Sequence, residues 1–169
     1  ITALSTYDRS VILNKLADLL EKNQEELISM IVSEIGKTTL DAKVEIARSA
    51  STLRVSAVEC TQLNGEVISS DHFGMTAGKR AMVEWKPMGL LLAITPFNFP
   101  YNLALHKIGP AFAVGNTILF KPHPQNYLSG KRLVELCLEA GMTENMIQMI
   151  MPTNEVMGQV VAHDDINLI

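Results

Sequence analysis

The sequence predicts an α/β protein in which helices and a protruding hairpin precede an open, doubly wound parallel sheet. Three observations support this fold class. Apolar residues recur at helical spacing in residues 7–60, a short middle segment alternates with a period of two, and apolar runs alternate with helical segments after residue 87. Strands that alternate with helices are typical of a parallel sheet with right-handed crossovers.

Helical structure is predicted from Tyr7 to Gly36, where the glycine provides a C-terminal stop. Its first apolar stripe steps by four and three residues: Ile12, Leu16 and Leu19. Thr38 is an N-cap candidate for a further long helix, which the Asn-Gly pair at residues 64–65 closes. A seam of this helix has the same steps and is expected to be buried: Ile46, Ala50, Leu53, Ala57 and Cys60. The acidic residues of these helices are expected to face solvent.

A hairpin is predicted for residues 69–86. Ala81, Val83 and Trp85 alternate with Met82, Glu84 and Lys86, which is the period of a strand with one apolar face. Such an exposed ribbon is suited to pairing with another chain. We therefore divide the chain into helices over residues 1–68, the hairpin over 69–86, and the first half of a nucleotide-binding sheet over 87–169.

Four apolar runs after residue 87 are predicted as parallel strands, and helical segments connect them. The strands comprise residues 89–94, 117–121, 146–151 and 166–169, and the helices comprise residues 102–115, 125–141 and 154–164. The run at residues 89–94 shows no alternation, as expected of a strand covered on both faces. The second helix carries an apolar stripe of Leu133, Leu136, Cys137 and Ala140.

Composition excludes several classes of protein. The 169 residues are 47% apolar with a formal net charge of −4, so the chain can form a core and shows no basic stripe for nucleic acid. No apolar run is long enough for a membrane span. The two cysteines have neither disulfide nor metal spacing, so we expect a reducing, cytoplasmic location and no metal.

Two proline-containing loops follow the first two strands, "TPFN" at residues 95–98 and "KPHP" at residues 121–124. Ligands of such sheets bind outside the carboxyl ends of the strands. Asn98 offers an uncharged NH2 donor, which suits an oxyanion that develops only during a reaction, although Asn98 alone could also cap a turn. Lys121 offers a cation for phosphates or ribose hydroxyls, unless it is a surface lysine.

Other reactive residue types have simpler interpretations. Cys60 and Cys137 lie on helical apolar stripes, where a free cysteine packs as a small hydrophobe. His106 is expected to pack or face solvent, and His72, His123 and His163 have no partner at metal-ligand spacing. The sequence contains neither G-x-G-x-x-G nor a P-loop pattern.

The segment "MGLLLAITPFNFPYNLALHKIGPAFAVGNTILFKP", Met88 to Pro122, closely resembles the aldehyde dehydrogenase superfamily. "LVELCLEAGM", "GQVVAHDDINLI" and the opening helices continue the resemblance over essentially the whole chain. The resemblance implies a cofactor-binding domain with an oligomerisation hairpin. It also implies that the sequence stops before the nucleophilic cysteine and the general-base glutamate, so we expect it to be part of a longer protein.

The resemblance also assigns roles to residues. Asn98 matches the family's oxyanion asparagine, and Lys121 matches the lysine that bonds the adenine-ribose hydroxyls. The carbonyl groups from Ile94 through Thr95 and Pro96 to Phe97 match the loop beside the cofactor. Pro122, His123 and Pro124 continue the second loop, and Gly158 is a further contact candidate. Pro124 stands where NAD-preferring members often have a glutamate, which favours NADP or dual use.

The resulting hypothesis is NAD- or NADP-dependent oxidation of a small aldehyde or semialdehyde to the acid through a cysteine thioester. The "HKIGPAF" stretch is reminiscent of members acting on lactaldehyde or succinate semialdehyde. Two alternatives stay open: a CoA-acylating relative, and a nucleotide-binding or assembly module without catalytic activity, which is what this chain alone would be. A homodimer or homotetramer is expected from the hairpin.

Overall fold

The computed structural model describes residues 4–69 and 74–169. Its first part consists of three helices: α1 (Thr6–Lys22), α2 (Gln24–Ile35) and α3 (Thr39–Cys60). Ser5 and Asp8 form a capping box at the start of α1, and the Thr38 side chain accepts a bond from Asp41 N at the start of α3. Gly36 ends α2 with a φ of 68°, a conformation that glycine adopts without strain. The helices predicted from the sequence are therefore confirmed, with a break at Asn23.

The three helices bury one apolar face each. The predicted α3 seam is confirmed, because Ile46, Ala50, Leu53, Ala57 and Cys60 are all at most 2% exposed. In α1 the buried residues are Leu13, Leu16, Ala17 and Leu20, whereas Ile12 and Leu19 lie at the edge of the core. The prediction that the acidic residues face solvent is wrong for Glu45, which is 1% exposed and forms an ion pair.

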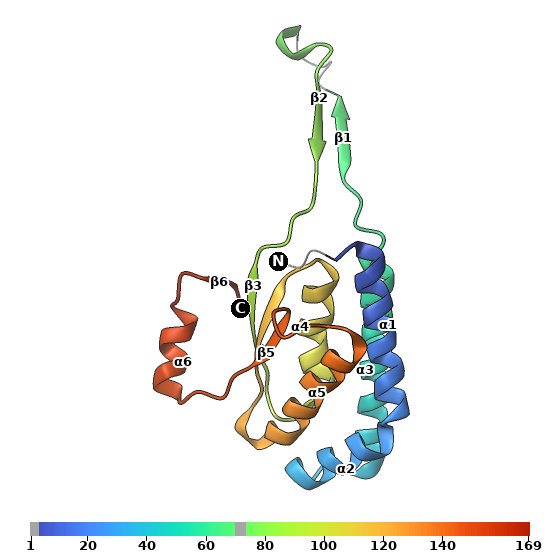
Figure 1. The fold of residues 1–169 in the computed structure, drawn as a ribbon, viewed down its shortest axis with the longest axis vertical. Coiled ribbons are helices and arrows are strands. Elements are labelled where there is room, and N and C mark those ends of the chain that lie inside the picture. The colour runs from blue at the N-terminus through green and yellow to red at the C-terminus, as the bar shows by residue number, and fades with distance from the viewer. Residues whose placement is uncertain (1–3, 70–73) are drawn as a thin grey trace.

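A two-stranded ribbon projects from the body of the molecule (Figure 1). It pairs β1 (Glu66–Ser69) with β2 (Arg80–Val83) in antiparallel register, and a 3-10 turn, η1 (Gly74–Thr76), lies near its tip. All eight strand residues are exposed. The predicted hairpin strand is confirmed for residues 80–83, whereas Trp85 and Lys86 lie beyond its end. The division of the chain at residues 68 and 86 stays a prediction, and residues 70–73 lie outside the described part.

The second half forms a four-stranded parallel sheet in the order β5-β4-β3-β6. The strands are β3 (Leu90–Ile94), β4 (Thr117–Lys121), β5 (Ile147–Met149) and β6 (Ile166–Leu168). The helices α4 (Asn102–Ala113), α5 (Tyr127–Ala140) and α6 (Asn154–Val161) connect them, and a 3-10 turn, η2 (Pro124–Asn126), precedes α5. The predicted open parallel sheet is confirmed.

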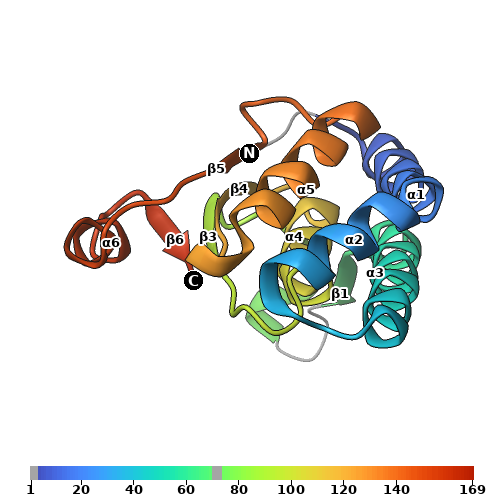
Figure 2. The same cartoon turned by 90° about the horizontal axis from the view of Figure 1, so that it is seen from below.

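The strand order reverses at β3, because β4 and β5 lie on one side of it and β6 on the other. Accordingly, α4 and α5 lie on the side of the sheet toward α1–α3, and α6 lies on the opposite side (Figure 2). This is the doubly wound arrangement, in which ligands bind outside the carboxyl ends of the strands near the reversal. Since the chain enters β3 from the hairpin, those carboxyl ends lie away from it, close to α2 (Figure 1).

Close packing joins α4 to α3. Gly109 lies where a Cβ atom would come within 2.9 Å of the Ser56 hydroxyl, so a larger residue would require the Ser56 side chain to shift. Leu105, Ile108 and Phe112 of α4 are fully buried in the same core. Because α4 begins directly after the loop that carries Asn98, the packing of α4 also fixes where that loop ends.

Candidate functional site

The two proline-containing loops lie side by side at the carboxyl edge of the sheet. Ile94 at the end of β3 is in register with Lys121 at the end of β4, and Thr95 N donates a hydrogen bond to Lys121 O at 3.2 Å. The Asn126 side chain then ties the loops together, because its amide nitrogen donates to Phe97 O at 2.9 Å and to Pro96 O at 3.4 Å. The structure thus brings the two predicted loops to one place.

Asn98 presents its side chain at this edge. The residue is exposed, and within residues 4–69 and 74–169 its amide group makes no hydrogen bond. Its backbone carbonyl, by contrast, accepts a bond from Lys37 Nζ at 2.9 Å. A fixed backbone with an uncommitted NH2 group is what a donor to a transient oxyanion requires. The structure therefore agrees with the role that the resemblance implies for Asn98, which stays a prediction.

Lys121 lies on the neighbouring strand end. Its ammonium group contacts the Pro122 carbonyl at 3.3 Å, and no carboxylate of the described residues forms an ion pair with it. Its donors therefore remain available to hydroxyl or phosphate oxygens. The rings of Phe97 in the first loop and His123 in the second loop contact each other, with centroids 5.3 Å apart, and provide an apolar surface. A lysine and a pair of rings at the same edge of the sheet fit the polar and apolar parts of a dinucleotide, so the residues present suit NAD or NADP.

Pro124 and His123 have structural roles as well. Pro124 occupies the first position of η2, where its fixed φ is favourable and its missing N–H is not needed. The His123 ring accepts a bond from Gln125 N through Nδ1 at 3.2 Å and thereby caps the turn. Only Nε2 of this ring is left as a donor toward a ligand. Gly158 lies within α6 with open space around it, and its contact with a cofactor stays a prediction.

The sequence did not reveal the residues that hold these loops. Glu45 is buried in α3 and accepts bonds from Tyr101 N at 2.9 Å and Asn102 N at 3.2 Å, at the start of α4. Glu34 of α2 accepts bonds from Leu128 N at 2.6 Å and Ser129 N at 2.9 Å, at the start of α5. Two glutamates from the N-terminal helices therefore cap the two helices that follow the candidate loops.

A sequence signal existed for one of them. Glu45 falls on the buried seam of α3, three residues after Ala42 and four before Ser49. A carboxylate at a core position implies a partner, because burying an unpaired charge is costly. Its partners lie 56 and 57 residues away, so no local pattern identifies them.

Neither cysteine is suited to act as a nucleophile. Cys60 is buried and its thiol donates to Thr6 O and Ala113 O, and burial raises the pKa of Cys137 to about 12. A thiol with that pKa stays protonated near neutral pH, and only the thiolate attacks. The prediction that both cysteines pack in the core is confirmed.

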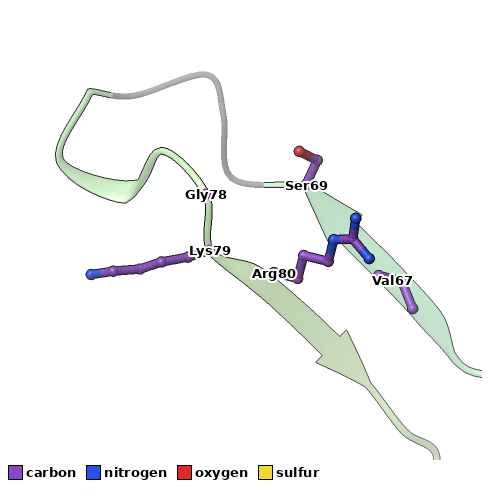
Figure 3. A pocket seen from close by; sticks show the side chains of 5 residues that line it. All are labelled: Val67, Ser69, Gly78, Lys79 and Arg80. Atoms are coloured by element: carbon purple, nitrogen blue, oxygen red, sulfur yellow. The ribbon is translucent and has the colours of Figure 1, made fainter.

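Other features of the described residues do not form a chemical site. The described residues contain no cluster of three or more metal-ligating side chains, and His72 lies outside them. None of the helices in the same residues has the length and apolar character that crossing a membrane requires. A cavity of about 340 Å³ lies at the hairpin, where Arg80 extends toward Val67 and Ser69 while Lys79 points away (Figure 3).

An open, doubly wound parallel sheet with two polar loops at its carboxyl edge is the architecture of nucleotide-binding domains. The chain matches the aldehyde dehydrogenase family over residues 1–169. It therefore belongs to the aldehyde dehydrogenase family. This confirms the resemblance that the motifs around Asn98 and Lys121 indicate.

Curated relatives give the same result. The chain is 50% identical over 165 residues to sulfoacetaldehyde dehydrogenase of Neptuniibacter caesariensis, covering 98% of this chain and 36% of that protein. It is 37% identical to NADP-dependent glyceraldehyde-3-phosphate dehydrogenase of Streptococcus equinus, covering 99% of this chain and 36% of that protein. The chain thus spans about a third of the length of the curated relatives it matches.

Solved structures confirm the fold. The NADP complex of NADP-dependent glyceraldehyde-3-phosphate dehydrogenase from Bacillus halodurans matches with a TM-score of 0.92 and 40% identity, over 97% of this chain and 35% of that one. An NAD-dependent benzaldehyde dehydrogenase from Corynebacterium glutamicum matches with a TM-score of 0.89 and 29% identity, over 97% of this chain and 35% of that one.

Proposed function

We propose that this chain, together with the remaining length that its relatives possess, forms an aldehyde dehydrogenase that oxidises a small aldehyde to the acid with NAD or NADP. The observation that carries the proposal is that the loop after β3, which contains Asn98, lies beside the end of β4, which is Lys121, in a family fold. Asn98 serves the reacting carbonyl and Lys121 serves the cofactor. Without the remaining length, the chain binds nucleotide or partner subunits at most.

Asn98 acts on charge that develops during the reaction. In the mechanism that the family resemblance implies, a cysteine in the remaining length of the protein attacks the aldehyde carbon, and the carbonyl oxygen becomes an oxyanion. The Asn98 NH2 group donates to that oxygen, and this hydrogen bond strengthens as negative charge develops there. When the oxyanion collapses, the carbon loses a hydride, which bound NAD or NADP would accept, and a thioester remains. Water then hydrolyses the thioester and releases the acid.

The cofactor supplies the hydride acceptor when it is bound. Lys121 would hold its ribose hydroxyls, and the loop from Ile94 to Phe97, which Asn126 fixes through the Pro96 and Phe97 carbonyls, would lie beside it. Pro124 leaves no carboxylate at the end of the second loop, so a 2′-phosphate meets no repulsion there. We therefore propose use of NADP or of both cofactors, in agreement with the NADP dependence named for several relatives.

The test is an assay of the complete protein with a panel of aldehydes and each cofactor. Appearance of reduced nicotinamide and of the free acid, without added CoA, supports the proposal. An acyl-CoA product that requires CoA would identify a CoA-acylating enzyme instead. If neither cofactor is reduced with any aldehyde, the proposed function is wrong and the binding module is the better description.

A substrate with an anionic group is the favoured candidate within this class. The relative at 50% identity is named for sulfoacetaldehyde, and others are named for sulfolactaldehyde and glyceraldehyde-3-phosphate. A cavity of about 390 Å³ between α3 and α4 is lined by Arg48, Thr52 and His106, and Arg48 forms no ion pair with the described residues. The expected result is a higher kcat/KM for sulfoacetaldehyde than for propionaldehyde, and an Arg48→Met variant should lose that preference.

The hairpin is proposed to pair with another copy of the chain, giving a dimer or tetramer in the cytoplasm. Apolar side chains on it are strongly exposed: Val67 at 64%, Met82 at 74% and Trp85 at 72%. Exposed apolar patches of this kind mark interfaces. A Val67→Asp, Met82→Asp double variant should run at a lower mass in light scattering; an unchanged mass would contradict this role.

A further inference from the structure

The loop that carries Asn98 is held from outside the sheet by a buried ion pair. Glu45 of α3 has a fully buried side chain, and its Oε2 lies 2.7 Å from Lys37 Nζ. Lys37, just before α3, is 13% exposed in its side chain. Both partners come from the N-terminal part of the chain, 61 residues before Asn98 for Lys37 and 56 residues before Tyr101 for Glu45.

Each partner makes its own contact with the loop. Lys37 Nζ donates to Asn98 O at 2.9 Å and lies 3.5 Å from the centre of the Phe99 ring. Glu45 Oε1 accepts from Tyr101 N at 2.9 Å and from Asn102 N at 3.2 Å. The two members of this ion pair thus hold the loop by hydrogen bonds, at Asn98 and at the start of α4. With Asn126 on the other side, the loop is fixed from two directions.

Stability alone does not account for a buried ion pair at this place. A buried ion pair is often no more stabilising than a well-packed apolar pair, because both charges must leave water. The second contact of the cation is informative. Lys37 Nζ donates to the backbone carbonyl of Asn98, and the side-chain amide of the same residue lies at the candidate site. Fixing that carbonyl fixes the peptide of Asn98 and therefore the origin of its side chain.

We propose that Lys37 and Glu45 are positioning residues that set the direction in which the Asn98 amide points at the developing oxyanion. This inference rests on the proposed function of Asn98. Because a displacement of about 1 Å in a reacting geometry costs up to about 100-fold in rate, the pair controls the chemical step without touching the substrate. It leaves the binding of the cofactor at Lys121 unchanged.

The experiment uses the complete protein and the variants Lys37→Met, Glu45→Gln and the two combined. Lys37→Met leaves a buried carboxylate without its cation and is expected to lower stability as well as rate. The double variant removes both charges, and the glutamine that Glu45→Gln introduces can still accept from the α4 amides, so its stability should return toward that of the wild type. Arg54→Met, which breaks an exposed ion pair with Asp18 and Glu21 on the same helix bundle, is the matched control.

Hydride transfer in a single turnover is the first measurement. The double variant should remain about 10- to 100-fold slower than the wild type, with the KM for the cofactor within about twofold. Lys37→Arg, which keeps the cation, should recover part of the rate, and Arg54→Met should match the wild type. If the rate of the double variant recovers together with its stability, the pair is merely structural and the proposal is overturned.

Backbone hydrogen exchange across residues 96–102 is the second measurement, and it does not depend on activity. Exchange at Phe99, whose peptide Lys37 holds through the Asn98 carbonyl, should be faster in the double variant than in Arg54→Met. If the complete wild-type protein oxidises no aldehyde, the proposed function fails, and exchange alone then decides whether the pair holds the loop. Unchanged exchange would refute the positioning role in either case.

Discussion

The two loops at the carboxyl edge of the sheet are built in opposite ways. The loop after β3 presents a neutral amide, Asn98, and takes its cation, Lys37, from another part of the chain to hold its backbone. The loop after β4 carries its own cation, Lys121, whose ammonium group is left without a carboxylate among the described residues. In the first loop the charge of Lys37 holds the backbone, and in the second loop the charge of Lys121 is available to a ligand.

The difference separates two tasks. A donor for an oxyanion must be accurately placed before the reaction, and the charge near Asn98 holds its backbone instead of facing the substrate. A group that holds a cofactor must bind in the ground state, so Lys121 keeps its charge available. The division predicts that substitutions in the two loops change different kinetic constants.

The largest effect is expected for Asn98→Ala in the complete protein. Loss of one oxyanion donor should lower kcat by about 100- to 1,000-fold. The KM for the cofactor should change by less than about twofold, because the Asn98 side chain makes no hydrogen bond to Lys121 or to any other described residue. Steady-state kinetics with saturating aldehyde measure both constants, and a fall in kcat of less than about twofold would refute the role of Asn98.

An intermediate effect is expected for Lys121→Met. A hydrogen bond to a charged group contributes about 1.5–3 kcal/mol, so the KM for NAD or NADP should rise about 10- to 100-fold. At saturating cofactor, kcat should stay within about threefold of the wild type, because the first loop is untouched. Isothermal titration of the cofactor into each protein provides the check, and equal affinities would place Lys121 outside the cofactor site.

The smallest effect is expected for Pro124→Glu. A carboxylate at the first position of η2 would face a 2′-phosphate, so kcat/KM for NADP should fall by about 10-fold relative to that for NAD. Pro124→Ala is the matched control, because it removes the ring without adding charge. A wild type that already prefers NAD by about 100-fold would contradict the NADP interpretation of this position.

The sequence predicted the sheet well because its signals are local. The strand at Thr117–Lys121 has the predicted bounds, and both candidate loops emerge where the apolar runs stop. Parallel strands place such loops at one edge whatever their detailed register, so Asn98 and Lys121 could be brought together from pattern alone. Buried seams in α3 and α5 followed from helical spacing in the same way.

The anchors of the loops were missed because their signals are not local. Glu34 and Glu45 resemble ordinary acidic residues of amphipathic helices, and what distinguishes them is contact with amides 56 to 95 residues later. The buried face of α1 also differs from the predicted stripe. Leu13 and Leu20 are buried, whereas Ile12 and Leu19, which the stripe contained, lie at the edge of the core. Periodicity finds a face of a helix but does not choose between adjacent large apolar residues along it.

The division between the two loops is tested most directly by measuring Asn98→Ala and Lys121→Met side by side in the complete protein. Single-turnover hydride transfer at saturating cofactor and the dissociation constant for NADP should be recorded for both. The expected result is a slow Asn98→Ala with normal affinity and a Lys121→Met of near-normal rate with weak affinity. If both variants lose rate and affinity to the same extent, the two loops act as one unit and the division is wrong.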